Sequence, residues 1–295
     1  MKTKDYMAKE NKMTNKDEIL EALGDGVVEN LDPELRRAFD FADSDVPAEL
    51  KDPKKLQQKE GHLIVSGDGV FYTLQGEGPT MGMPCVFLRL HICNLRCVWC
   101  DAWYTWNPKT KEFWTEPTHW TIEEAAFNIQ ATWDCDNPNV EKRLIITGGE
   151  PLLQQRKIEQ LMDELPEWQF EIETNGTMMP SDKLLSRCQF NCSPKLENSG
   201  NVRVARIKPE VLLKLAEGNT TFKFVVMKPE DLDEIEEDFI KGVGIPHNKV
   251  ILMPQGVTAE EVRQNGQKVA EYAKAKGFRL LGRLQNELWG AKRGV

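Results

Sequence analysis

The chain has 295 residues, 40% of them hydrophobic, which is enough for one large or two small domains with a packed core. Its 38 basic and 47 acidic residues give a net charge of −9, which argues against the broad positive surface of most nucleic-acid-binding proteins. No apolar run approaches the ~20 residues that a membrane helix needs, and no apolar stretch follows the charged N-terminus, so we expect neither a membrane span nor a secretion signal.

Residues 1–60 differ in composition from the rest of the chain. They hold 15 acidic and 11 basic residues but neither Cys nor Trp, and their amphipathic pieces are too short to form stable helices alone. We therefore expect a mobile acidic N-terminal extension over residues 1–60 and a folded catalytic domain over residues 61–295. A small regulatory or partner-binding arm is the alternative for the extension.

From residue 61 onward, predicted strands alternate with predicted helices. Several strands are continuous apolar runs, as is typical of parallel strands covered on both faces. The predicted strands are residues 63–65, 70–74, 86–90, 144–147, 170–174, 189–192, 222–227, 250–253 and 279–281. Helical spacing of apolar residues predicts helices near 122–133, 158–165 and 232–239, and capping boxes at Thr121/Glu124 and Thr258/Glu261 mark two helix starts. The alternation predicts an α/β fold, either an open sheet or a complete or partial (β/α) barrel, with ligands at the carboxyl ends of the strands.

Three of the seven cysteines lie within eight residues, in Cys93-Asn-Leu-Arg-Cys97-Val-Trp-Cys100. Together with the odd total, this crowding argues against a secreted disulfide scaffold and for reduced thiols in the cytoplasm. Three sulfur ligands at this spacing can hold a [4Fe–4S] cluster and leave one iron open to a substrate or cosubstrate. A zinc site with His91 as fourth ligand is the alternative. The remaining cysteines have no partner at this spacing, so we expect Cys85, Cys135, Cys188 and Cys192 to be structural.

A second motif, Thr147-Gly-Gly-Glu-Pro151, closes a predicted buried strand. The two glycines let the main chain approach a ligand closely, and the Glu150 carboxylate can accept hydrogen bonds from an ammonium group. With the cysteine triplet and Trp99 before its third member, this motif resembles the radical S-adenosylmethionine (SAM) superfamily. In that superfamily the segment holds the amino group of the methionine part of SAM.

Further segments resemble one family of this superfamily, the 7-carboxy-7-deazaguanine synthases. They run in order over residues 64–295: Phe71-Tyr-Thr-Leu-Gln-Gly-Glu-Gly78, Phe87-Leu-Arg89, Cys100-Asp-Ala-Trp-Tyr-Thr-Trp106, Glu173-Thr-Asn-Gly-Thr177, Ser193-Pro-Lys195 and Leu288-Trp-Gly-Ala-Lys-Arg-Gly-Val295. The resemblance implies an incomplete (β/α) barrel, a homodimer, and conversion of 6-carboxy-5,6,7,8-tetrahydropterin to 7-carboxy-7-deazaguanine with loss of ammonia. This lyase reaction belongs to queuosine and deazapurine biosynthesis, and its electron donor would be a flavodoxin or ferredoxin.

The resemblance also implies roles for individual residues. Cys93, Cys97 and Cys100 would bind the cluster. The pterin would contact Leu74, Gln75, Gly76, Glu77, Arg89, Thr147 and the terminal carboxylate of Val295, with Arg89 pairing with the substrate carboxylate. SAM would contact Trp99, Cys100, Asp101, Gly148, Gly149, Glu150, Ser193, Pro194, Lys195 and Gln255. On the residues alone, the alternatives are a glycine-rich turn at Glu77, a strand-end ion pair at Arg89, a surface position for Lys195 and a frayed C-terminus.

One position departs from the family pattern. Members commonly have Thr or Ser after Cys-Asp, which supplies an oxygen ligand to a Mg²⁺ that also binds the substrate, whereas this chain has Ala102. Magnesium prefers oxygen ligands and keeps several waters, so only substrate, water or the more distant Thr105 could hold the ion here. We therefore do not expect a magnesium site of the family type. Two other functions stay open, an activase of a glycyl-radical enzyme and a non-catalytic metal-cluster binding module.

Overall fold

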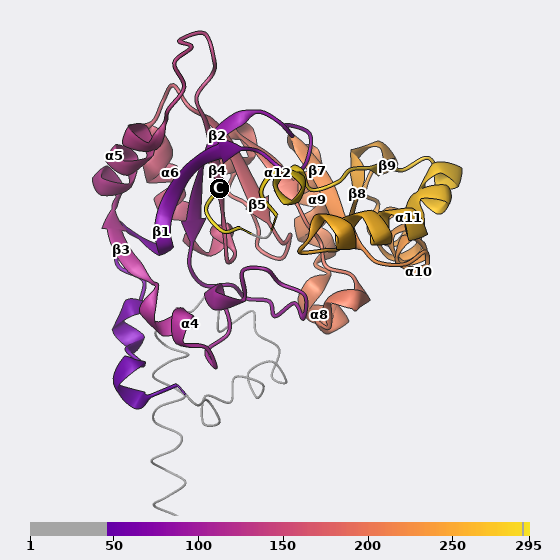
Figure 1. Cartoon of the computed structure of the whole chain (residues 1–295), viewed down its shortest axis with the longest axis horizontal. Helices are drawn as coiled ribbons and strands as arrows, with labels where there is room; N and C mark the ends of the chain where they lie inside the picture. The colour runs from indigo at the N-terminus through magenta and orange to yellow at the C-terminus, as the bar shows by residue number, and fades with distance from the viewer. Residues whose placement is uncertain (1–45, 291) are drawn as a thin grey trace, which may run out of the picture.

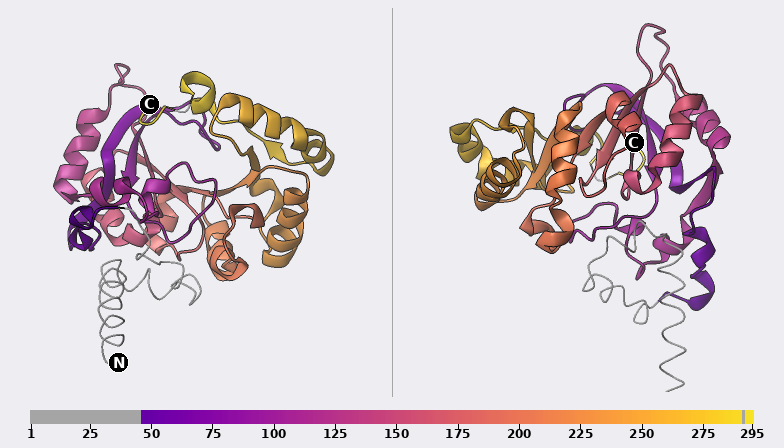
Figure 2. Two further views of the ribbon diagram at one scale, coloured as in Figure 1. Left: turned by 60° about the horizontal axis from the view of Figure 1, so that its bottom comes forward. Right: turned by 180° about the vertical axis from the view of Figure 1, so that it is seen from behind.

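The computed structural model describes residues 46–290 and 292–295. Within them, nine strands form one sheet in the order β3-β1-β2-β4-β5-β6-β7-β8-β9. Strand β1 is antiparallel to β2 and β3, and from β2 to β9 all neighbours are parallel. The sheet curves into an open arc with helices along its outer side (Figure 2, left). This arrangement confirms the α/β fold and the incomplete barrel.

The element bounds are as follows. The strands are β1 (His62–Leu74), β2 (Pro84–Leu90), β3 (Thr118–Thr121), β4 (Arg143–Gly148), β5 (Gln169–Thr174), β6 (Cys188–Cys192), β7 (Thr220–Val226), β8 (Val250–Pro254) and β9 (Arg279–Leu280). The longer helices are α5 (Ile122–Thr132), α6 (Gln155–Glu164), α9 (Pro209–Glu217), the π-helix η7 (Ile235–Val243) and α11 (Ala259–Lys276). The shorter ones are α4 (Lys111–Thr115), α7 (Asp182–Arg187), α8 (Arg203–Arg206), α10 (Glu230–Glu234) and α12 (Leu284–Trp289) (Figure 1).

The strands differ from the sequence prediction at the start of the domain. The segments predicted at 63–65 and 70–74 are one long strand, β1, whose pairing with β2 shifts register between Val65 and Val70. Gly67 and Gly69 lie in that irregularity with φ of 61° and 77°, which glycine adopts without strain. The short edge strand β3 was not predicted, because its four residues carry no run of buried side chains.

Two helix starts agree with the sequence prediction. In α5 and α11 the capping boxes are formed in full, with Thr121 and Thr258 accepting hydrogen bonds from the main chain of Glu124 and Glu261. The main apolar core lies between the sheet and its helices and includes the fully buried Ile146 of β4. None of the helices that the structure describes is long and apolar enough to cross a membrane.

The folded body begins before residue 61, where the sequence placed the end of the extension. Val46 and Leu56 are buried in a second apolar cluster with Ile64, Phe113 and Trp114. The boundary was placed too late because this segment is charged overall and contributes only a few apolar anchors. The rest of the expected extension, residues 1–45, lies outside the described residues.

Candidate active site

A cavity of about 500 Å³ lies at the carboxyl ends of the parallel strands. Its wall includes the ends of β1, β2, β4, β5, β7 and β8, the segment after β2 and the C-terminal residues. Nearly all site residues expected from the resemblance line it, namely Leu74, Gln75, Gly76, Glu77, Arg89, Cys93, Cys97, Trp99, Cys100, Asp101, Thr147, Gly148, Gly149, Ser193, Lys195, Gln255 and Val295. Glu150 and Pro194 are not part of the lining.

The three cysteines of the triplet lie in one wall of the cavity. Burial raises the pKa of all three thiols, that of Cys100 to about 11, so their thiolate forms need a strongly positive partner such as iron. In the part of the chain described, no three His, Cys, Asp or Glu side chains gather closely enough to hold one metal ion. A cubane cluster differs in this respect, because each sulfur binds a different iron atom. The donor set therefore fits an iron–sulfur cluster.

The cysteine sulfurs also accept hydrogen bonds from the protein. The side-chain amide of Asn201 donates to Sγ of Cys97 at 3.3 Å, and the main-chain N–H of Leu95 donates to Sγ of Cys93 at 3.5 Å. Asn201 is itself fixed, because its Oδ1 accepts from the main-chain N–H of Arg96 at 2.9 Å. Such bonds to ligand sulfurs stabilise negative charge on a cluster and help to set its reduction potential.

His91 does not fit the alternative zinc site. Its Nδ1 lies 3.1 Å from Oγ of Ser66, its Nε2 lies 3.1 Å from the carbonyl oxygen of Phe113, and its ring is buried. Burial lowers the pKa of His91 to about 4, so the ring stays neutral. Strand β2 ends at Leu90, so His91 opens the cysteine segment rather than lying in the strand. With both ring nitrogens hydrogen-bonded, it has no lone pair to offer a metal.

Gly148 and Gly149 let the end of β4 pack directly against the start of the cysteine segment. A Cβ at Gly149 would lie 1.9 Å from the carbonyl oxygen of Ile92, and one at Gly148 would lie 2.0 Å from that of Leu90. The main-chain N–H groups of Gly149 and Glu150 donate to these carbonyls of Leu90 and Ile92 at 3.0 and 2.8 Å. Ile92 has φ of 79°, a strained conformation for a β-branched residue that these contacts hold in place.

The Glu150 side chain differs from the expectation, because its carboxylate does not face the cavity. It is fully buried and accepts hydrogen bonds from Oγ1 of Thr174 at 2.7 Å and from the main-chain N–H groups of Asn175 and Leu152 at 2.7 and 3.0 Å. The side chain thus joins the ends of β4 and β5. Contact between this segment and a SAM amino group would have to come from the main chain at Gly148 and Gly149.

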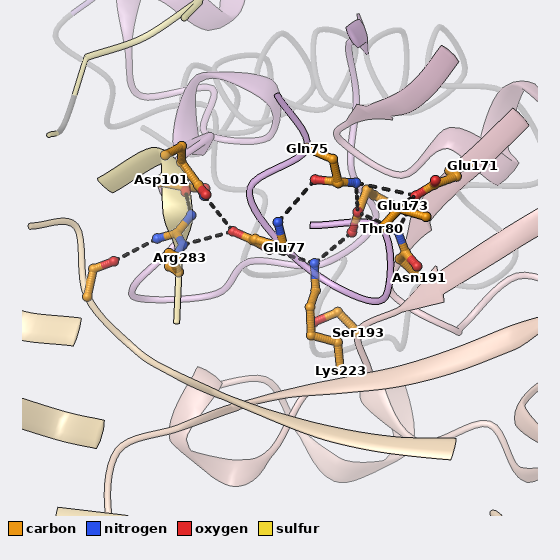
Figure 3. A network of polar contacts seen from close by, with 12 residues as sticks. Gln75, Glu77, Thr80, Asp101, Glu171, Glu173, Asn191, Ser193, Lys223 and Arg283 are labelled. Carbon is orange, nitrogen blue, oxygen red and sulfur yellow. Dashed lines mark hydrogen bonds and ion pairs between the residues drawn. The ribbon is translucent and has the colours of Figure 1, made fainter. Parts of the chain in front are cut away.

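Glu77 lies at the centre of a charged network (Figure 3). Its Oε2 accepts from Nζ of Lys223 at 2.6 Å, and its Oε1 accepts from Nε of Arg283 at 2.8 Å and from the amide of Gln285 at 2.7 Å. Burial alone would raise the pKa of Glu77, but the charges of Lys223 and Arg283 outweigh burial and hold that pKa well below its usual range. Glu77 is therefore a paired carboxylate with most of its lone pairs occupied.

The network continues into the end of β5. Lys223 also donates to Glu173 at 2.8 Å, and the other oxygen of Glu173 accepts from the amides of Asn191 and Gln75 at 3.0 and 3.3 Å. The Gln75 amide oxygen in turn accepts from the main-chain N–H of Glu77 at 3.2 Å. Gln75 is therefore buried within the network and forms part of the cavity wall.

The positive charges of Arg89 and Lys195 differ in their hydrogen-bond partners. Among the described residues no carboxylate pairs with Arg89, whose guanidinium lies 5.9 Å from the ring centroid of Phe71. This excludes the strand-end ion pair within the described part and leaves a cation facing the cavity. Lys195 is no ordinary surface lysine, since its Nζ donates to the carbonyl and hydroxyl oxygens of Ser193 at 2.6 and 2.9 Å and lies 5.8 Å from the Trp99 ring centroid.

The C-terminal residues are held against the domain rather than frayed. The Arg293 guanidinium makes two hydrogen bonds to the Glu116 carboxylate, at 2.9 and 2.6 Å, and lies 3.6 Å from the ring centroid of Tyr104. Val295 lines the cavity, and the end of the chain lies at the β1 side of the sheet (Figure 2, left).

The residues around Ala102 do not fit a magnesium ion. Ala102 has no side-chain oxygen, and the buried hydroxyl of Thr105 donates to the Ala102 carbonyl oxygen at 2.8 Å. The neighbouring carboxylate of Asp101 accepts from Nη2 of Arg283 at 2.7 Å. A protein oxygen ligand of the family type is therefore absent from this wall of the cavity.

Sequence reasoning missed several residues of the site. Glu173 and Arg293 lie within segments that carry the family resemblance, but no role had been assigned to them. Lys223 was detectable as a single charged residue inside the apolar strand β7. Arg283 and Gln285 sit in no recognisable pattern, and only the fold brings them to Glu77.

Comparison with known proteins finds similarity over most of the chain. Residues 88–189 match the family model described as Radical SAM superfamily. The 7-carboxy-7-deazaguanine synthase of Pyrobaculum aerophilum is 34% identical over 76% of this chain and 95% of its own, and that of Rhodopirellula baltica is 32% identical over 85% and 96%. The solved structure of QueE from Escherichia coli shares the fold, with 24% identity, a TM-score of 0.55 and coverage of 76% of this chain and 94% of that one. The chain therefore belongs to the 7-carboxy-7-deazaguanine synthase family of radical SAM enzymes.

Proposed function

We propose that this protein converts 6-carboxy-5,6,7,8-tetrahydropterin to 7-carboxy-7-deazaguanine with release of ammonia. The observation that carries the proposal is that a single cavity brings together the cysteine triplet, the glycine pair of β4 and the charged network around Glu77. Membership of the family implies a [4Fe–4S] cluster, SAM and a source of electrons.

The cofactor half of the cavity is built around the cysteines. Cys93, Cys97 and Cys100 would hold the cluster, which with bound SAM supplies a 5′-deoxyadenosyl radical. The main chain at Gly148 and Gly149 comes close enough for a ligand to reach it. The remaining SAM contacts would come from Trp99, Asp101, Ser193, Lys195 and Gln255, all of which line the cavity. Pro194 would act only by shaping the segment Ser193–Lys195.

The substrate half is built around fixed charges. The guanidinium of Arg89, which pairs with no carboxylate of residues 46–290 and 292–295, fits the substrate carboxylate, because its planar fork can donate two parallel hydrogen bonds. Leu74, Gly76, Thr147 and the Val295 carboxylate would complete the contacts with the pterin. Gln75 and Glu77 would act mainly by holding this wall, since most of their hydrogen-bonding capacity is used within the protein. Rigid placement of the substrate close to the radical source and exclusion of water are the tasks of these residues.

Several features extend the proposal beyond the cavity. A flavodoxin or ferredoxin would supply the electron, and the active form would be a homodimer. The product would enter queuosine or related deazapurine synthesis.

The function is tested with the full chain, reconstituted without oxygen with iron and sulfide. SAM, dithionite and 6-carboxytetrahydropterin are added, and the product is identified by mass. We expect the deazaguanine product and no product from Cys97→Ala, whereas Cys135→Ala, a cysteine outside the cavity, should keep the activity. Full activity of Cys97→Ala, or SAM cleavage without conversion of the pterin, would contradict the proposal.

A further inference from the structure

We infer that the Arg283 guanidinium supplies a fixed positive charge next to Asp101, and that the reaction in this chain needs no divalent metal ion. The inference rests on the proposed function, since it concerns charge in the cavity that takes the carboxylated substrate. It is carried by the contacts of Arg283, by the side chains around Ala102 and by the charges that line the cavity.

All three parts of the Arg283 guanidinium are engaged. Nε donates to Glu77 at 2.8 Å, Nη2 donates to Asp101 at 2.7 Å, and Nη1 donates to the carbonyl oxygen of Gly256 at 2.6 Å. The side chain is only 15% exposed. A guanidinium keeps its charge at all relevant pH values and holds a fixed geometry, so these three bonds place a permanent positive charge in the cavity wall.

That charge lies beside the residues that would have to supply protein ligands to a metal ion, namely Asp101, Ala102 and Thr105. Asp101 is paired with Arg283, the side chain of Ala102 has no donor atom, and the Thr105 hydroxyl points back to the Ala102 carbonyl. An ion that bound the Asp101 carboxylate would compete with the Arg283 guanidinium, which already holds Oδ2 at 2.7 Å. The fixed positive charge of the guanidinium also repels a cation placed beside it, which opposes metal binding.

The other charges of the cavity act in the same direction. Among the described residues that line it, six have basic and three have acidic side chains, and Val295 adds its terminal carboxylate. The basic ones are Arg89, Lys195, Lys223, Arg283, Lys292 and Arg293, and the acidic ones are Glu77, Asp101 and Glu173. A divalent cation would enter against this excess of positive charge, whereas a carboxylated substrate is attracted by it.

Arg283 is thus a positioning residue that links the two halves of the cavity. It joins Asp101, which follows the cluster ligand Cys100, to Glu77 in the substrate half. Loss of its charge should leave two carboxylates facing the cavity, and these form a better site for a divalent cation than the native pair. The variant Arg283→Gln is therefore expected to acquire the metal dependence that the native chain lacks.

Two measurements on the reconstituted full chain test the inference. Product formation is compared in metal-free buffer with EDTA and in millimolar Mg²⁺, and Mn²⁺ binding is titrated by electron paramagnetic resonance in the presence of SAM. For the native chain we expect rates that agree within about twofold and no stoichiometric Mn²⁺ binding. For Arg283→Gln we expect a rate reduced at least tenfold in EDTA, partly restored by Mg²⁺, and one bound Mn²⁺. The surface variant Arg263→Gln, which removes an exposed pair with Glu260, should behave as the native chain.

Loss of native activity in EDTA with recovery in Mg²⁺, or one Mn²⁺ bound per native chain, would overturn the inference. An Arg283→Gln variant with the native rate in EDTA would overturn the role of Arg283. If no product forms under any condition, the proposed function fails, and Mn²⁺ binding by the native chain still decides the inference because it needs no turnover.

Discussion

Nζ of Lys223 lies 2.6 Å from Oε2 of Glu77, although the two residues are 146 positions apart in the chain. The lysine side chain is 4% exposed and also pairs with Glu173 at 2.8 Å, so one buried cation joins β7 to β5 and to the segment after β1. Burying these charges is costly, and the arrangement persists because the pairing is nearly complete.

Replacement of Lys223 by methionine should therefore destabilise the protein strongly. The change leaves two buried carboxylates with less compensation, and loss of one partner of a buried pair costs about 3–5 kcal/mol. The free energy of unfolding in urea measures the loss. The matched control is Lys241→Met, whose partner Glu237 is exposed, and which should change stability by less than about 1 kcal/mol. Similar small losses in both variants would contradict this account of the network.

The same pair predicts how stability depends on pH. The pKa of Glu77 is held below its ordinary value of 4.5, so its contribution is present above that pH and is lost as the pH falls through the lowered pKa. The pKa of Lys223 is raised above its ordinary value of 10.5, so its contribution is present below that pH and is lost as the pH rises through the raised pKa. The stability difference between the native chain and Lys223→Met should stay constant from about pH 6 to 9 and shrink at lower pH. A difference that already changes near pH 7 would assign the effect to other groups.

The sequence predicted those parts of the site that depend on local pattern. The cysteine spacing, the glycine pair of β4 and the order of strands and helices are properties of short segments, and in the structure the cysteines and the glycines line one cavity. The partners of Glu77 could not be predicted in this way, because Lys223 and Arg283 reach it only after the sheet has formed. The Glu150 side chain was expected to bind the SAM amino group because a carboxylate can accept hydrogen bonds from an ammonium group. In the structure the carboxylate accepts a hydrogen bond from the main-chain N–H of Asn175 instead.

Substitution of Gly149 by alanine should separate the end of β4 from the cysteine segment. The new Cβ would lie 1.9 Å from the carbonyl oxygen of Ile92 and 2.8 Å from the main-chain nitrogen of Cys93, and main-chain atoms cannot move aside as a flexible side chain can. We expect loss of cluster incorporation, measured by absorbance and iron content, at a level close to that of Cys97→Ala. Gly266→Ala in α11 is the matched control, since its Cβ would meet only the ring carbons Cγ and Cβ of Pro254, at 3.3 and 3.9 Å. Helix propensity favours alanine over glycine at position 266 by up to about 1 kcal/mol, so the control should not be destabilised. Normal cluster content in Gly149→Ala would show that the close approach is dispensable.

Substitution of Asn201 by leucine should lower the reduction potential of the cluster. The amide donates to Sγ of Cys97, and loss of such a bond removes stabilisation of the more negative, reduced form. A loss of about 0.5–1.5 kcal/mol corresponds to a shift of roughly 20–65 mV for one electron. A redox titration followed by electron paramagnetic resonance measures it, and Asn201→Asp should shift the potential further in the same direction. An unchanged potential in both variants would mean that this bond does not tune the cluster.

Substitution of Glu116 by glutamine should weaken substrate binding without stopping SAM cleavage. Glu116 holds the C-terminal segment through two bonds to Arg293, and Oγ of Ser66 connects the same carboxylate to His91 at the start of the cysteine segment. A neutral amide cannot accept both guanidinium bonds, so Val295 should lose its fixed place in the cavity wall. Because Arg293 is partly exposed, we expect a modest effect, with the KM for the pterin raised roughly tenfold, or about 1.4 kcal/mol.

The control Glu260→Gln breaks a surface pair with Arg263 and should leave KM unchanged. A fall in kcat at constant KM would instead place the effect in the cofactor half of the cavity, next to the segment that His91 and Ser66 hold. That result would contradict the role assigned to the C-terminal segment.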